Sequence, residues 1–259
     1  MAVWDRWLRG GDSLVLTPTE WKALMDEAFS PLLERELGLS YLGSYFWAGP
    51  WEDHRRRMVR VFLINQSSGT LQWGWAFDFA PHLSGKRLAW HRTDRSARQD
   101  VWEVSPDFVK STGPARDRVT FSAWGRDHRA ILREHRRAAL ALLPQSRRYY
   151  AGTARPEALL RSMETALEDP YVRFTQGTQL TISAAFLAAA LGRTEHGREL
   201  LAHLNVSEQC QETRRLLTEQ LDRQPRLWPE KGETGDDPDH RPGERPAGRH
   251  GGQLSGGAV

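Results

Sequence analysis

The chain has 259 residues, of which 39% are hydrophobic and 27% charged, and its formal net charge at pH 7 is +3. This composition is typical of a soluble globular protein and excludes fibrous, collagen-like and disulfide-framework proteins. The single cysteine, Cys210, can form no internal disulfide, and nothing at the N-terminus resembles a secretory signal, so we expect a cytoplasmic protein.

The most apolar run, Leu180 to Leu191, is shorter than the roughly 20 residues that a bilayer-spanning helix needs. It also contains Thr181 and Ser183. We therefore expect a buried helix in this run and no membrane partner.

Charge and tryptophan are unevenly distributed along the chain. Basic residues exceed acidic ones in residues 1–150 but not in residues 151–224, and all tryptophans except Trp228 lie at or before Trp124. Residues 225–259 are rich in Pro, Gly and charged residues and have too few apolar side chains to form a core. The sequence predicts a domain over 1–150, a helical subdomain over 151–224 and a disordered tail over 225–259.

The first predicted helix begins at a capping box. Thr17 supplies the N-cap hydroxyl, Pro18 occupies the first helical position, and Glu20 follows three residues after the cap. Apolar residues recur every three or four positions until Gly38, where we expect the helix to end.

Five segments rich in β-branched and aromatic residues then predict strands: Tyr41–Trp47, Met58–Asn65, Leu71–Phe79, Asp100–Val104 and Val119–Trp124. In the third, large apolar residues alternate with Gln72, Gly74, Ala76 and Asp78, as in a strand with one buried face. The turn residues between the second and third segments favour antiparallel neighbours.

A second amphipathic helix is predicted from Asp127 to Leu143, with Pro144 at its end. The first domain is therefore predicted to be an α+β sandwich, in which a helix is followed by an antiparallel sheet of four or five strands and a second helix. The remainder predicts a small all-helical unit with helices over residues 156–167, 178–191, 195–204 and 207–221.

Catalytic and cofactor motifs are missing from the sequence. His128 and His135, like His196 and His203, are seven residues apart, about 10 Å along a helix and too far for one metal ion. Neither a nucleophile elbow nor a glycine-rich phosphate loop occurs. We expect no metal, no cofactor and no catalytic residue.

Arginine clusters are the most conspicuous feature. Clusters at Arg55–Arg60 and Arg126–Arg137 offer a nucleic-acid surface, because phosphate contacts dominate non-specific affinity. Acidic residues are interleaved with these arginines, which favours a solvated surface laced with salt bridges. Nucleic-acid binding is the alternative hypothesis.

The leading hypothesis is a non-enzymatic protein-interaction module, of an immunity-like or regulatory kind, with a protein partner. Tryptophan and arginine are the residues that most often anchor interfaces. The predicted binding residues are Trp47, Trp51, Arg55, Arg57, Arg60, Gln72, Asp78, Trp90, Arg92 and Trp102. A third hypothesis is an enzyme whose site lies on the sheet face, around Gln72, Asp78, His82 and His91.

The order of the pieces from Trp21 to Val104 also resembles a known pattern. A helix is followed by an aromatic strand, a strand that ends in Asn65-Gln66-Ser67-Ser68, an alternating strand, the basic Arg87-Leu88 pair and an acidic segment around Trp102. This order resembles the small bacterial family called domain of unknown function 4304. The resemblance implies an α+β fold and no catalytic residue.

Overall fold

The computed structural model describes residues 17–64, 68–85, 87–103, 117–122, 127–204 and 211–228. Helix α1, Pro18–Leu37, begins as predicted: Thr17 Oγ1 accepts from the Glu20 backbone at 3.3 Å, and a Glu20 carboxylate oxygen accepts from Thr17 N at 2.7 Å. Gly38 ends the helix in the left-handed conformation, at φ 67°. Both ends of this helix are therefore fixed by local sequence.

The sheet confirms the α+β class. Its six antiparallel strands are β1 (Ser40–Gly43), β2 (Phe46–Ala48), β3 (Arg55–Leu63), β4 (Ser68–Phe77), β7 (Val101–Glu103) and β8 (Thr120–Ser122). The order is β1-β2-β3-β4-β7, and β8 pairs with the other end of β4. The predicted antiparallel pairing in the middle of the sheet is confirmed, with Arg60 opposite Gln72.

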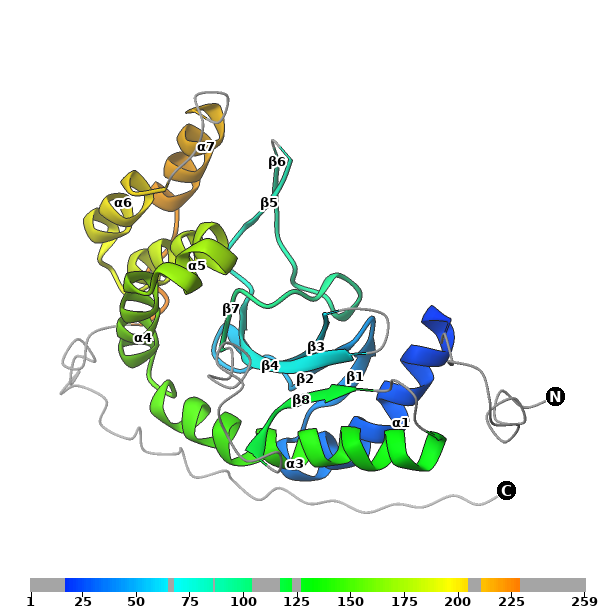
Figure 1. Ribbon diagram of the computed structural model, residues 1–259. Coiled ribbons are helices and arrows are strands. Elements are labelled where there is room, and N and C mark those ends of the chain that lie inside the picture. Colours follow the sequence, from blue (N-terminus) through cyan, green and yellow to red (C-terminus); the bar gives the residue numbers. More distant parts are fainter. Residues whose placement is uncertain are drawn as a thin grey trace, which may run out of the picture. The chain divides into compact units, whose positions relative to one another are not determined.

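Three features of the sheet region differ from the prediction. The expectation that the third segment has one buried face is wrong, because the chain around Ala97 and Gln99 covers the side of β4 that carries Gln72, so both faces of β4 are buried. The single strand expected over Tyr41–Trp47 is wrong, because Ser44 and Tyr45 form a turn with φ of 49° and 69° that separates β1 from β2. A separate two-stranded hairpin, β5 (His82–Ser84) with β6 (Arg87–Ala89), was not predicted. It projects from the side of the sheet opposite α1 (Figure 1).

Helix α3, His128–Gly152, is longer than predicted, and the expectation that Pro144 ends it is wrong. Proline removes the helical hydrogen bond to the carbonyl of Leu140. The Leu140 side chain is 56% exposed, so this stretch lies at the surface, where water can satisfy the carbonyl. Beyond the proline, Ser146 and Tyr150 are buried and keep the last turns packed.

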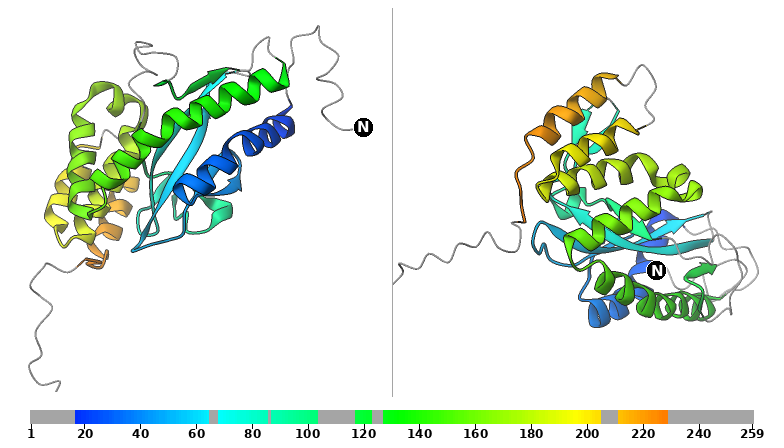
Figure 2. Two further views of the ribbon diagram at one scale, coloured as in Figure 1. Left: turned by 90° about the horizontal axis from the view of Figure 1, so that it is seen from below. Right: turned by 90° about the vertical axis from the view of Figure 1, so that its left-hand side faces the viewer.

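Helices α1 and α3 lie side by side across one face of the sheet, which we call the covered face (Figures 1 and 2). Its core is aromatic: the Phe29 ring of α1 meets Trp47 edge to face at 5.7 Å and Phe121 at 5.6 Å. Trp47 is fully buried and donates from its indole nitrogen to Ser30 Oγ at 2.8 Å.

The helices α4 (Pro156–Glu168), α5 (Pro170–Ala190), α6 (Thr194–Ala202) and α7 (Gln211–Asp222) pack at one end of the sheet (Figure 1). Helix α5 starts earlier than the predicted residue 178, because Asp169 caps it and Pro170 occupies its first position. Gln176 of α5 donates to the Trp102 carbonyl of β7 at 3.1 Å. None of the described helices has the length and apolarity to cross a bilayer.

The division into a 1–150 domain and a 151–224 subdomain stays a prediction. Residues 225–228, which the sequence assigned to the tail, are described, and Leu227 N donates to the Ala190 carbonyl at 2.7 Å. The predicted tail from residue 229 onward lies outside the described residues.

Candidate functional site

Strand β3 divides its arginines between the two faces of the sheet, because successive side chains of a strand point in opposite directions. Arg55 and Arg57 lie on the covered face, opposite Phe77 and Trp75 of β4. Arg56 and Arg60 lie on the other face, which we call the polar face. The polar face also carries Met58, Phe62, Gln72, Gly74, Ala76 and Trp102.

The two arginines on the covered face hold the end of α3. Arg55 donates to the carbonyls of Thr153 and Ala154, and its guanidinium carbon lies 4.9 Å from the Trp75 ring. The Arg57 guanidinium lies 6.0 Å from the Tyr150 ring. These predicted binding residues are thus engaged within the fold.

Arg56 is buried on the polar face and has a carboxylate partner. Its Nη1 lies 2.5 Å from Asp94 Oδ1, and its guanidinium carbon lies 4.4 Å from the ring of Trp51. Trp51, a predicted binding residue, is half-buried. Asp94 therefore balances the Arg56 charge, while the Nε and Nη2 atoms of Arg56 have no hydrogen-bond partner among the described residues.

Arg60 differs from Arg56 because no described carboxylate pairs with it. Its Nε donates to Gln72 Oε1 at 2.6 Å, and its guanidinium carbon lies 4.2 Å from the Trp102 ring. Burial lowers the pKa of Arg60 to about 10, and the nearby charge of Arg98 adds to the shift. The structure thus brings together three predicted binding residues from three strands around an unbalanced cation.

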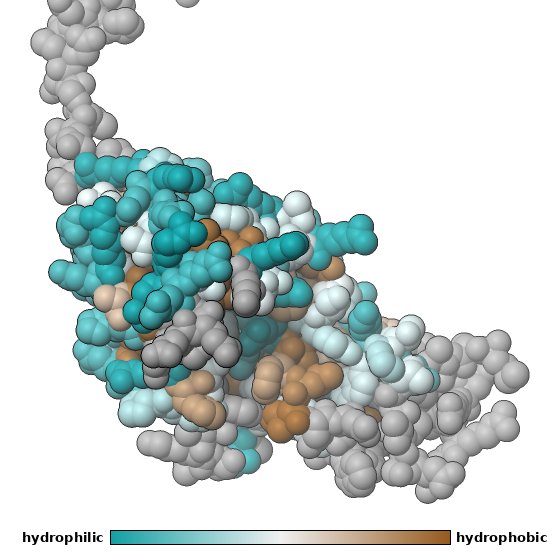
Figure 3. Space-filling view, turned by 90° about the horizontal axis from the view of Figure 1, so that it is seen from above, coloured by the Kyte–Doolittle hydropathy of each residue, from teal (hydrophilic) through white to brown (hydrophobic). Residues whose placement is uncertain are grey.

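The surroundings of Arg60 suit an anionic ligand with an apolar part. The Phe62 side chain is 44% exposed, and its ring lies 6.0 Å from the Arg60 guanidinium. In the view from above, brown hydrophobic residues are visible next to teal hydrophilic ones (Figure 3). A guanidinium beside an aromatic surface can form a two-pronged hydrogen bond with a carboxylate.

Glycine places Trp102 over this site. Gly74 lies opposite Trp102 in the β4–β7 pair, and a Cβ atom at Gly74 would be 1.9 Å from the Val101 carbonyl oxygen. Only a glycine therefore allows β7 to approach β4 so closely. The hydrogen bond from Gln176 to the Trp102 carbonyl fixes β7 from the other side.

The arginine cluster of α3 does not join this surface. The α3 residues Ile131 and His135 are buried against the covered face, whereas Arg129, Arg133 and Arg136 are exposed. The exposed arginines therefore point away from the sheet, on the side opposite Arg60. Arg126 of the predicted cluster lies outside the described residues.

Three more predicted residues, Asp78, Trp90 and Arg92, meet at a second place. They line a pocket of about 420 Å³ together with His54. His54 Nδ1 lies 3.1 Å from Asp78 Oδ2, and Arg92 Nε donates to the Asp78 carbonyl at 2.5 Å. Gln72 is not among the lining residues, so the sequence expectation that Asp78 and Gln72 share one ligand has no support in this geometry.

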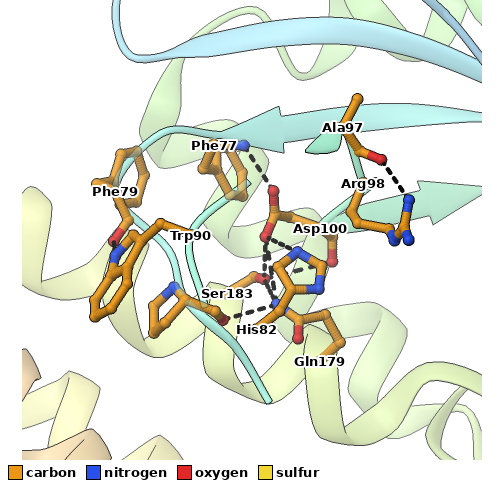
Figure 4. Close-up of polar contacts among 10 residues, drawn as sticks. Phe77, Phe79, His82, Trp90, Ala97, Arg98, Asp100, Gln179 and Ser183 are labelled. Atoms are coloured by element: carbon orange, nitrogen blue, oxygen red, sulfur yellow. Dashed lines mark hydrogen bonds and ion pairs between the residues drawn. The ribbon is translucent and has the colours of Figure 1, made fainter. Parts of the chain in front are cut away.

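A buried carboxylate, Asp100, joins the sheet to α5 (Figure 4). Asp100 Oδ2 accepts from Phe77 N at 2.7 Å, while Oδ1 lies 3.0 Å from His82 Nε2 and accepts from Gln179 at 3.3 Å. The His82 and His91 rings are 4.6 Å apart. Burial lowers the pKa of His91, and the charges of His82 and Arg98 lower it further.

The four residues of the enzyme hypothesis are thus divided among three places: Gln72 beside Arg60, Asp78 beside His54, and His82 with His91 beside Asp100. Within the described ranges, no group of three or more His, Cys, Asp or Glu residues is placed to hold a metal ion. Trp47 has no surface for a partner because it is fully buried.

Sequence reasoning considered His54 and Arg98 only as members of basic clusters, and it did not single out Asp100. The signal for the Arg60 site was present, because the alternation of β3 separates Arg56 and Arg60 from Arg55 and Arg57.

Comparison of the chain with protein-family models, with curated proteins and with solved structures gave no match.

Proposed function

We propose that the protein is a non-enzymatic interaction module that binds an acidic segment of a partner protein on the polar face of its sheet. The observation that carries this proposal is Arg60, a half-buried cation that is stacked on Trp102 and has no described carboxylate partner. Burying an unpaired charge is costly, so a carboxylate from a partner would remove a cost that the free protein bears.

The neighbourhood of Arg60 favours a protein over a small ion. Phe62 and Ile64 at the end of β3 are 44% and 48% exposed, and apolar side chains beside an arginine are typical of interface hot spots. The partner segment is therefore expected to combine Asp or Glu with a large apolar residue.

Nucleic acid is supported less well by the same geometry. Several described arginines pair with acids of their own chain, among them Arg147 with Glu36 and Arg198 with Asp222. The exposed arginines of α3 and Arg60 lie on opposite sides of the sheet, whereas a nucleic-acid surface needs its cations on one face. Membership of the domain of unknown function 4304 family and a bacterial, cytoplasmic setting remain predictions from the sequence.

The test uses short fluorescein-labelled peptides in which Asp and Glu flank a Phe or Leu, with fluorescence anisotropy as the readout. We expect binding that weakens with salt, and at least tenfold weaker binding by Arg60→Met. Arg60→Lys keeps the charge but loses the planar fork, so it is expected to bind with intermediate affinity.

Arg129→Met is the matched control, because it removes an exposed arginine from α3 on the opposite side of the sheet. It should bind the acidic peptides as the wild type does. The proposal is wrong if peptides with Lys in place of Asp and Glu bind equally well, or if Arg60→Met binds normally. A single-stranded oligonucleotide that binds in an Arg60-dependent way more tightly than the peptides would favour the nucleic-acid alternative.

A further inference from the structure

The pocket beside His54 is built from four separate parts of the chain. Its lining comes from the turn before β3, from residues 78–92, from Phe186 of α5 and from the chain around and after the end of α7. Its volume of about 420 Å³ falls in the range of small-molecule sites. The pocket is a different place from the Arg60 site, because Arg60 lies about 20 Å further along β3.

The turn that supplies His54 has a conformation that side chains disfavour. Asp53 and His54 have φ of 50° and 64°, in the left-handed region. Contacts hold both side chains: Asp53, which does not line the pocket, accepts from the Trp228 indole, and His54, which does, pairs with Asp78. Strained backbone that is held by such contacts is common at ligand sites.

The charges at the pocket do not balance. Asp78 is taken up by His54, and it is the one carboxylate among the lining residues. Arg92 and Arg223 also line the pocket, and within the described residues neither forms an ion pair. Two guanidinium groups with one engaged carboxylate give a positive site, which favours an anionic ligand.

Aromatic side chains form part of the wall. The Trp90 indole donates to the Phe79 carbonyl at 3.4 Å, which fixes its ring, and Trp90 is half-buried (Figure 4). Phe79 lines the same pocket and packs edge to face on Trp228 at 5.7 Å. A fixed aromatic ring beside a guanidinium suits a ligand that is itself aromatic.

We infer that this pocket binds a small aromatic molecule that carries one anionic group, a carboxylate or a phosphate. The ring of the ligand packs on Trp90 and Phe79, and its anionic group accepts hydrogen bonds from Arg92 and Arg223. This inference is independent of the proposed function, because it uses different residues.

The experiment titrates the full chain, labelled with ¹⁵N at tryptophan, with four probes: 3-phenylpropionate, phenyl phosphate, the uncharged 3-phenylpropionamide and propionate. The indole signal of Trp90 is assigned by its loss in Trp90→Phe. We expect both aromatic anions to shift this signal, and the amide and propionate to bind at least tenfold more weakly. The ratio between carboxylate and phosphate probes identifies the anionic group.

Arg223→Met is the decisive variant, because no described hydrogen bond of the fold depends on that guanidinium. Arg223→Met should weaken the binding of the aromatic anions at least tenfold, whereas Arg60→Met should leave their affinity unchanged. Equal binding of the amide, wild-type affinity in Arg223→Met, or an unmoved Trp90 signal at probe concentrations of about 10 mM would overturn the inference.

Discussion

The two faces of the sheet are stabilised in different ways. On the covered face, Phe29, Trp47 and Phe121 interlock beneath α1 and α3, and Trp47 has its indole hydrogen bond satisfied. On the polar face, Arg60 lies on Trp102 with no described acid to balance it. Both faces contribute to the core, because Met58, Ala76 and Ala97 are buried together on the polar face, but around Arg60 the polar face keeps a group whose charge a partner can satisfy.

The largest expected effect is a difference in stability between variants on the two faces of the sheet. Phe29→Ala should lower the free energy of unfolding by about 3–5 kcal/mol, because it leaves a cavity between α1 and the sheet. Phe62→Ala on the polar face should lower it by less than about 1 kcal/mol, since Phe62 is 44% exposed. Urea unfolding followed by circular dichroism measures both, and equal losses would contradict the distinction.

The next effect concerns the close pairing of β7 with β4 at Gly74. Gly74→Ala should cost about 1–3 kcal/mol, because its Cβ would be 1.9 Å from the Val101 carbonyl oxygen and must displace Trp102. Gly152→Ala at the end of α3 is the control: its Cβ would meet nothing within 4 Å, so stability should stay equal or rise by up to about 1 kcal/mol. Thermal unfolding compares the two variants, and a Gly74→Ala protein as stable as the wild type would show that β7 moves freely.

A smaller effect distinguishes an arginine without a described carboxylate partner from one that donates to backbone carbonyls. Arg60→Met should change the free energy of unfolding by less than about 1 kcal/mol, because the removal of an unpaired charge offsets the loss of the hydrogen bond to Gln72. Arg137→Met should lower it by about 1–3 kcal/mol, because Arg137 donates to the Arg118 and Thr120 carbonyls at 2.6 Å. The account of the polar face is wrong if Arg60→Met destabilises as much as Arg137→Met.

The smallest effect is a pH dependence of opposite sign in two histidines. The pKa of His91 is lowered by burial, so the unfolded chain binds more protons and His91 costs stability as pH falls below about 6.5. The pKa of His196 is raised by its hydrogen bond to Glu164, so its contribution is present below pH 6.5 and lost as pH rises.

Urea unfolding at pH 8 and pH 5.5 measures this difference. Relative to the wild type, His91→Asn should gain stability on acidification, and His196→Asn should lose it. Two variants that change in the same direction would contradict the assignment.

Much of the fold was readable from local sequence. Thr17 and Glu20 cap α1, Gly38 ends it, and the alternation around Gln72 identifies β4, because these signals depend on neighbouring residues alone. The turn at Ser44 and Tyr45 was missed because neither residue is a glycine or asparagine, the usual signs of such a turn.

The Arg60 site was predicted only as separate residues. Arg60, Gln72 and Trp102 come from three strands, and their meeting depends on the register of β3 with β4 and on the approach allowed by Gly74. Neither the register nor this close approach can be predicted from the sequence next to any one of these residues. The same holds for Asp78 and His54, which the antiparallel pairing of β3 with β4 brings together.

The most direct test of the account is an NMR titration of the ¹⁵N-labelled chain with the tightest acidic peptide. It follows the Arg60 Nε–H signal and the indole signals of Trp102 and Trp47. We predict that the Arg60 and Trp102 signals shift together while the Trp47 signal, on the covered face, stays unchanged. A peptide that binds without moving Arg60 and Trp102 would contradict it.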